Sequence, residues 1–427
     1  MPDLPRLLAI IGSGETSPTM GKLHRQLFDR LGPGPVPAAI VTTPFGFQEN
    51  AEDVAAKTVG YFARTVGRDV EVADLADAAA VGTLAYETAI ARLRGAAWVM
   101  SGPGSPSYAL RHWRGTPVPD VLASKLRHGG CLVFASAAAV TLGRLALPVY
   151  EIYKVGEPPH WMEGLDLLAE VGLAVAVIPH YDNAEGGRHD TRYCYVGERR
   201  LQALESQLPP GTFVLGVDEH TACVLDVDAA TATVTGNGAV WVRHQGRNER
   251  FGAGTTLPIA ELAGLAAGDR RGEVAHSAPG AGPGRGATDP DRAGAATPLV
   301  AETTRLRQVF DAAVAGRQGP GAAEAALELS RLVEAWSHDT FESDELDRAQ
   351  ALLRTMIVGL GEAAARGLRD PRERLAPFVE ALLAVRRRAR QERRWDEADA
   401  VRGTLVEAGV EVRDTPGGVE WHLGSGN

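Results

Sequence analysis

Residues 132–140 read LVFASAAAV, and this stretch decides the fold prediction. The first three residues are typical of a strand that is buried on both faces. The alanines after Ser136 favour a helix, so the serine lies at a junction between a strand and a helix. A sharp turn there would hold the hydroxyl clear of the backbone, with the first N–H groups of the helix facing the same point. The alternative is that Ser136 only caps the helix.

Short apolar runs of the same kind recur on both sides of this junction, from about residue 3 to 262. They alternate with stretches in which apolar residues follow helical spacing. This alternation predicts an α/β domain with a mostly parallel sheet covered by helices on both faces. From Gly211 the strands become closely spaced, and we expect them at the far edge of the same domain, partly antiparallel.

The 427 residues are expected to form two domains joined by a linker. We place the α/β domain at residues 3–265. Residues 266–298 are rich in Gly, Pro and Ala and cannot bury enough apolar surface to order themselves, so we expect a flexible linker. Residues 299–427 are predicted to form a helical bundle, with a small β-hairpin after Gly409.

The composition is that of an ordinary globular protein, with 44% hydrophobic and 23% charged residues. A formal net charge of -10 excludes a global attraction to nucleic acid or anionic membranes, so an RNA contact needs a local basic patch. The first residues lack the pattern of a signal peptide, and Cys131, Cys194 and Cys223 are far apart. We therefore expect a cytoplasmic protein without disulfides, metal or cofactor.

Five short motifs follow one another in a fixed order along the first domain. They are GSGE at 12–15, SGPGS at 101–105, ASAAA at 135–139, IPHY at 178–181 and GVDEHTA at 216–222. This ordered set resembles the peptidase S51 family of dipeptidase E and cyanophycinase, which has a class I glutamine amidotransferase-like fold. The resemblance covers roughly residues 7–245. No single motif is specific, and the order of all five carries the resemblance.

The resemblance implies roles for individual residues. Ser136 would be the nucleophile, His180 the general base, and Glu219 the carboxylate that orients the base, with its neighbour Asp218 as the alternative. The oxyanion hole would be formed at Gly102, Gly104 and Ala137. The implied reaction is hydrolysis of a small peptide or amide through an acyl-enzyme on Ser136, without metal.

Three residues depart from the family pattern. Ala138 stands where the elbow has a second glycine, and Phe134 occupies a position that is usually small. A phenyl ring there would close the elbow or tilt Ser136. Pro103 interrupts a Gly-Gly loop and has no N–H to donate. A second interpretation is therefore an inactive S51-like fold that serves as an RNA-binding or protein adaptor.

An arginine-rich helix precedes the C-terminal hairpin. Arginines can track phosphates and a tryptophan can stack on a base. The candidates for RNA contact are Arg387, Arg390, Arg394, Trp395 and Arg402. The alternative is a solvated helix face that is neutralised by the acidic residues between 392 and 399.

Residues 390–423 also carry a resemblance of their own. The segment WDEADAVR at 395–402 and the tail GVEVRDTPGGVEW at 409–421 resemble the C-terminal, anticodon-binding end of cysteinyl-tRNA synthetases. The resemblance implies tRNA as a partner. The catalytic motifs and zinc-binding cysteines of a synthetase are missing, so we expect no aminoacylation.

Overall fold

The computed structural model describes residues 4–184, 189–267, 298–337, 345–366, 371–415 and 418–423. The described residues divide into two compact units, which fall within Met1–Ala295 plus Glu334–Ser343 and within Ala296–Val333 plus Asp344–Asn427. Nearly all of the expected linker, residues 268–297, lies outside the described residues. Residues 266 and 267 of the expected linker belong to the helix α8 (Ile259–Ala267). Residue 298 is the first residue of the helix α9 (Pro298–Ala315).

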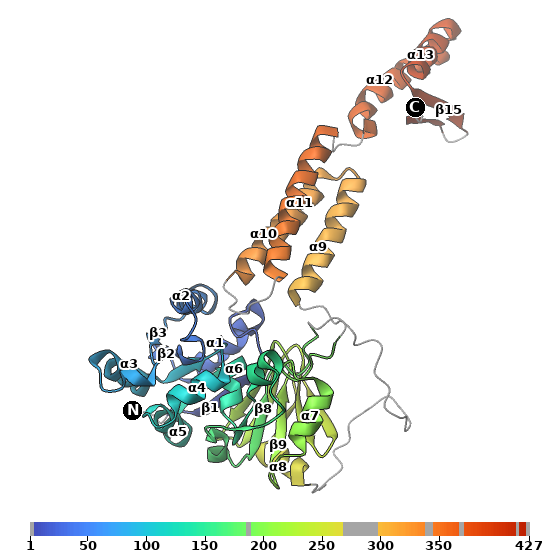
Figure 1. The fold of residues 1–427 in the computed structure, drawn as a ribbon. Helices are drawn as coiled ribbons and strands as arrows, with labels where there is room; N and C mark the ends of the chain where they lie inside the picture. Colours follow the sequence, from blue (N-terminus) through green and yellow to red (C-terminus); the bar gives the residue numbers. More distant parts are fainter. Residues whose placement is uncertain are drawn as a thin grey trace. The chain divides into compact units, whose positions relative to one another are not determined.

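An eight-stranded sheet forms the centre of the first unit, in the order β14-β11-β10-β1-β5-β4-β2-β3 (Figure 1). Neighbouring strands from β1 to β3 in this order are parallel. These parallel strands are β1 (Arg6–Ile11), β2 (Ala38–Val41), β3 (Glu71–Ala73), β4 (Trp98–Ser101) and β5 (Gly130–Ala135). The antiparallel edge consists of β10 (Thr221–Asp226), β11 (Thr231–Gly236) and β14 (Thr256–Pro258).

A second sheet of six strands has the order β13-β12-β9-β8-β6-β7. Its strands are β6 (Leu145–Ala146), β7 (Met162–Glu163), β8 (Val175–Ile178), β9 (Phe213–Val217), β12 (Ala239–His244) and β13 (Arg247–Gly252). The sequence prediction placed β9 and β12 at the far edge of the same domain, partly antiparallel, and did not include a second sheet. An apolar run specifies a strand but not its partner. Here Leu215 and Val240 share one core with Phe134 of the first sheet.

Helices cover both faces of the first sheet, because alternate residues of its strands point into different cores. Leu7 and Ile11 of β1 join the core under α1 and α2, whereas Leu8 and Ile10 join the core under α3 and α5. Each such fully buried Leu or Ile contributes about 1.5–3 kcal/mol. The helices of this unit are α1 (Gly21–Arg30), α2 (Ala51–Tyr61), α3 (Leu84–Gly95), α4 (Pro106–Trp113), α5 (Val118–His128), α6 (Ser136–Thr141), α7 (Gly197–Glu205) and α8. The predicted α/β class is confirmed.

Short turns of 3₁₀ or π helix complete this unit. They are η1 (Pro18–Met20), η2 (Thr43–Phe45), η3 (Phe62–Val66), η4 (Ala78–Ala80), η5 (Glu151–Val155) and η6 (Leu167–Val171). Figure 1 shows α7 beside β8 and β9, and the three share one apolar cluster through Leu201, Ile178 and Val214. All three cysteines are buried free thiols, and burial raises the pKa of Cys194 to about 12.

The second unit begins with three helices, α9, α10 (Gly319–Trp336) and α11 (Glu345–Arg366), of which α10 belongs to this unit up to Val333. Leu306, Phe310, Leu329 and Met356 from these helices form one core. Among the described residues, no helix is long and apolar enough to cross a membrane.

A second helical region ends in the predicted hairpin. Its elements are α12 (Pro371–Gln391), α13 (Trp395–Glu407), β15 (Val410–Thr415) and β16 (Gly418–Leu423). Gly409 ends α13 with a φ of 80°, a left-handed conformation that glycine adopts without strain. Val412 pairs with Trp421 across the hairpin, and both pack on Val379 and Leu383 of α12. The predicted helical domain with a terminal hairpin is confirmed.

Candidate active site

Ser136 lies at the junction of β5 and α6 with a φ of 49°. This left-handed conformation is uncommon for residues other than glycine, and such strain gathers at functional sites. The strand is held in place because it pairs in parallel with β1 on one side and β4 on the other. The residue before the helix is Ala135, so Ser136 does not occupy the capping position.

The structure brings together the three residues that the sequence proposed as a triad. Ser136 Oγ lies 2.9 Å from His180 Nε2, and His180 Nδ1 lies 2.8 Å from Glu219 Oε1. His180 follows β8 and is 4% exposed. Glu219 lies between β9 in the second sheet and β10 in the first, so the three side chains meet where the two sheets adjoin.

The two neighbouring carboxyl groups at positions 218 and 219 differ in their surroundings. Burial acts to raise the pKa of Glu219, but the hydrogen bonds from His180 and Asn183 outweigh it and hold this pKa below its ordinary value. Asp218 instead accepts hydrogen bonds at 2.8 Å from the N–H of Ala239 and from Trp241 Nε1. Burial, together with the nearby charge of Asp182, raises the pKa of Asp218 to about 7. Glu219 is therefore the carboxylate that contacts the histidine.

Of the three residues expected to form the oxyanion hole, Ala137 and Gly102 lie at the elbow. Ala137 is in the first turn of α6, where N–H groups have no partner within the helix. The N–H of Ala138 donates to the carbonyl of Gly102 at 3.1 Å, which ties the loop after β4 to the elbow. Gly104 has a φ of 129° and lies against the segment after β2, where an added Cβ would be 2.0 Å from the carbonyl oxygen of Pro44.

The two residues that depart from the elbow pattern both lie in the core. Phe134 is fully buried, and its ring lies 6.2 Å from that of Trp113 within the core. The ring is therefore part of the core that also contains Ala138 and Ala139 of α6. The side chain of Ala138 is also fully buried in this core.

The glycine motif at residues 12–15 makes room for the turn that carries Glu219. A Cβ on Gly12 would lie 2.0 Å from the carbonyl oxygen of Asp218, and one on Gly14 would lie 2.3 Å from His220 Nδ1. A Cβ on Gly102 would lie 2.9 Å from Glu15 Oε1. The motif thus packs between the loop after β4 and the turn before β10.

We expect Gly12→Ala to lower the free energy of unfolding by about 1–3 kcal/mol, as overpacking usually does. The added methyl group cannot fit against Asp218, so the turn that carries Glu219 must move. Urea unfolding measures the change. Gly95→Ala is the control, because a Cβ at Gly95 meets nothing within 4 Å. Equal stability of the Gly12 variant and the wild type would contradict this account.

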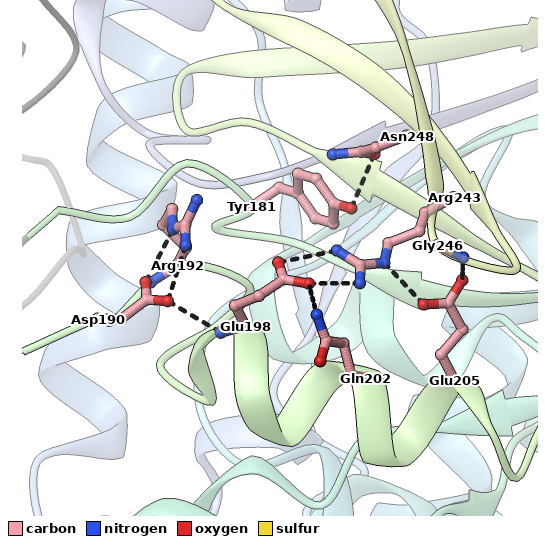
Figure 2. A network of polar contacts seen from close by, with 9 residues as sticks. All are labelled: Tyr181, Asp190, Arg192, Glu198, Gln202, Glu205, Arg243, Gly246 and Asn248. Carbon is pink, nitrogen blue, oxygen red and sulfur yellow. Dashed lines mark hydrogen bonds and ion pairs between the residues drawn. The ribbon is translucent and has the colours of Figure 1, made fainter. Parts of the chain in front are cut away.

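A buried ion network anchors the segment that follows His180 (Figure 2). Arg243 on β12 is 3% exposed and contacts Glu198 at 2.7 Å and Glu205 at 3.0 Å, both on α7. The hydrogen bond from Arg243 is the main cause that lowers the pKa of Glu198 to about 2. Asp190 accepts from the N–H of Glu198 at 2.9 Å, which continues the network along the segment.

The residue next to the histidine is packed against this network. The ring of Tyr181 lies 4.6 Å from that of Tyr193, and its hydroxyl donates to Asn248 Oδ1 at 3.1 Å. The guanidinium of Arg243 lies over the Tyr193 ring at 5.5 Å. Sequence reasoning missed this network and Asn183, because no motif joins residues so far apart in the chain. Across the described part of the chain, no three His, Cys, Asp or Glu side chains gather as a metal site would require.

The C-terminal helices and hairpin correspond to a known family. Residues 372–421 match the cysteinyl-tRNA ligase anticodon binding domain. The cysteine–tRNA ligase of Carboxydothermus hydrogenoformans is 45% identical over 49 residues, 12% of this chain and 10% of that protein. The enzyme of Moorella thermoacetica is 32% identical over 151 residues, 33% of this chain and 30% of that protein. The predicted resemblance of the C-terminal end is confirmed, and the chain spans only 10% to 30% of these relatives.

A solved structure is also similar to this chain. It is a peptidase from an acI-B1 Actinobacterium, 20% identical, with a TM-score of 0.49. The match covers 60% of this chain and 98% of that chain.

The candidate RNA contacts in the C-terminal helices differ in their surroundings. Arg390 donates to Asp414 at 2.8 Å, and Arg394 pairs with Glu392 and Glu397. These acidic partners offset part of the positive charge that the sequence suggested. The remaining candidates are Arg387, Trp395 and Arg402. All three side chains are exposed, and Trp395 is 55% exposed.

Proposed function

We propose that the first unit is a serine hydrolase of the peptidase S51 type, which cleaves an amide bond in a small peptide through an acyl-enzyme on Ser136. The hydrogen-bonded line from Ser136 through His180 to Glu219 carries this proposal. The left-handed φ of Ser136 supports it, because a strained turn at the end of a buried strand presents the hydroxyl to a substrate.

The reaction follows from the positions of the side chains. As Ser136 Oγ attacks the substrate carbonyl carbon, His180 Nε2 takes its proton. Glu219 holds the proton on Nδ1 and stabilises the imidazolium. The N–H of Ala137 and the loop at Gly102 stabilise the negative oxygen. His180 then gives its proton to the leaving amine. Afterwards it removes a proton from the water that attacks the acyl group, and it passes this proton to Ser136 Oγ as the acid leaves.

Hydrolysis of a substrate panel, measured as release of the amine or the alcohol, tests the proposal. The panel holds dipeptides with an N-terminal aspartate, β-linked aspartyl amides and small esters, and it is run on the wild type and Ser136→Ala. We expect turnover of at least one member by the wild type and loss of that turnover in the variant. Equal turnover by both proteins, or none by the wild type, would overturn the assignment.

We propose tRNA as a second ligand, bound by the C-terminal region. The match of residues 372–421 to an anticodon binding domain favours it, as does the exposed Trp395. Since Arg387 is exposed on α12, we assign it a phosphate contact.

We expect Arg387→Ala to weaken tRNA binding and to reduce the slope of log affinity against log salt by about one. Binding is measured by fluorescence anisotropy over a series of salt concentrations. Arg305→Ala is a matched control, because this arginine lies in a different helix and pairs with Glu302 at 2.6 Å. No binding at low salt, or equal losses in both variants, would refute the assignment.

A further inference from the structure

Two turns meet at the base of the proposed site. One follows β8 and carries His180, and the other links β9 to β10 and carries Glu219. The N–H of Tyr181 donates to the carbonyl of Val217 at 3.1 Å. In return, the N–H of Glu219 donates to Asp182 Oδ1 at 2.8 Å. These hydrogen bonds, one donated from each turn, thus fix the position of His180 relative to Glu219.

Asn183 adds a side-chain contact to this pair. It is 1% exposed, and its Nδ2 donates to Glu219 Oε1 at 3.1 Å. The same oxygen accepts the hydrogen bond from His180 Nδ1 at 2.8 Å. The N–H of Asn183 also donates to the carbonyl of His180 at 3.2 Å, so Asn183 contacts both members of the pair.

We propose that Asn183 is a positioning residue whose hydrogen bond to Glu219 Oε1 weakens the pull of this carboxylate on the imidazole proton of His180. A hydrogen bond to a carboxylate stabilises its negative charge and so competes with the bond from the histidine. Since a base works best when it is neutral near the working pH, this competition keeps His180 able to accept the serine proton. The role of Asn183 in catalysis rests on the proposed function, whereas its effect on the titration of His180 does not.

Other groups also face His180, and none of them is substituted in the Asn183 variants. Glu219 and His220 face it from the β9–β10 turn, and Asp182 faces it from its own turn. From the segment before α7, Tyr195 presents a ring 6.1 Å from the His180 ring, and the N–H of Cys194 donates to the His180 carbonyl at 3.1 Å. A change in the His180 titration on replacing Asn183 is therefore assigned to Asn183.

The first test measures the pKa of His180 by NMR titration of histidine-labelled protein, which needs no turnover. We expect Asn183→Leu to raise this pKa by about one unit, a tenfold increase in proton affinity. Asn183→Asp, which keeps the shape of the side chain, is expected to raise it as well, because it adds a negative charge. Asn248→Leu, which removes an amide bonded to Tyr181, is the control and is expected to leave the His180 pKa unchanged. An unchanged or lowered pKa in Asn183→Leu would overturn the proposal.

The second test asks whether Asn183 acts through Glu219. The rate of reaction with a fluorophosphonate is measured against pH for Asn183→Leu, Glu219→Gln and the double variant. In Asn183→Leu, we expect the pH at which the rate falls on the acid side of the profile to rise by the shift seen in the His180 titration. In the double variant, we expect Asn183→Leu to cause no change beyond that of Glu219→Gln. Separate, additive reductions of the reaction rate by the two substitutions would contradict the proposal. A wild type that does not react, while the NMR shift is present, would contradict the proposed hydrolase and leave the Asn183 inference standing.

Discussion

His180→Ala lowers the kcat/KM of amide hydrolysis by about 10⁴-fold, and Ser136→Ala lowers it by a similar factor, as expected for members of one catalytic unit. Without the imidazole, the Ser136 hydroxyl has no acceptor for its proton at 2.9 Å. The loss is not additive, so the double variant is expected to be as slow as either single variant. Steady-state kinetics on a substrate found in the panel measures all three.

His112→Ala provides a matched control for this prediction. His112 also lies near a carboxylate, with its Nδ1 3.3 Å from Asp77 Oδ1, but this nitrogen accepts a hydrogen bond from the N–H of Ala78 at 3.0 Å. It lies on α4 and has no part in the proposed reaction, so this variant should keep the wild-type rate. A double variant of Ser136 and His180 that is far slower than either single variant would show that the two residues act independently.

Arg243→Met lowers the free energy of unfolding by about 3–5 kcal/mol, because removing one partner of a buried ion pair leaves the other charge uncompensated. Glu198 and Glu205 both lose their cation, and the Glu205 side chain is only 8% exposed. Urea unfolding measures the loss. Arg6→Met is the control, because Arg6 pairs with Asp228 at the surface and such pairs contribute about 0–1 kcal/mol.

The pH dependence of stability checks the same ion network. The hydrogen bond from Arg243 depresses the folded-state pKa of Glu198 to about 2, below its unfolded value. The stabilisation is therefore complete above the unfolded pKa and is lost as the pH falls toward 2. The Arg243→Met variant should show a shallower loss over this range. An Arg243 variant that matches Arg6→Met in stability and in pH dependence would contradict the anchoring role.

Much of the site could be proposed from the sequence because each proposed triad residue lies at the end of a strand or in a short motif. The apolar run before Ser136 predicts the buried strand, and the alanines after it predict the helix. The resemblance of the ordered motifs to the peptidase S51 family then implies the roles of His180 and Glu219. The sequence left Asp218 open as an alternative, and the structure separates the two because only Glu219 contacts the histidine.

Other features depend on contacts between distant parts of the chain and could not be predicted. Local patterns do not show that β9 belongs to a second sheet, since its apolar run looks the same in either sheet. Arg243 reads as one surface arginine among many until α7 brings two glutamates to it. Arg390 seemed available for RNA, but the hairpin places Asp414 beside it.

Fluorophosphonate labelling of the purified protein, with the adduct located by peptide mass spectrometry, tests the central claim most directly. The account predicts one adduct, on Ser136, that disappears in Ser136→Ala and forms far more slowly in His180→Ala. The folded state of each variant is checked by its urea unfolding curve. An unlabelled wild type, or an adduct that persists in Ser136→Ala, would contradict the claim that Ser136, His180 and Glu219 form a working hydrolase.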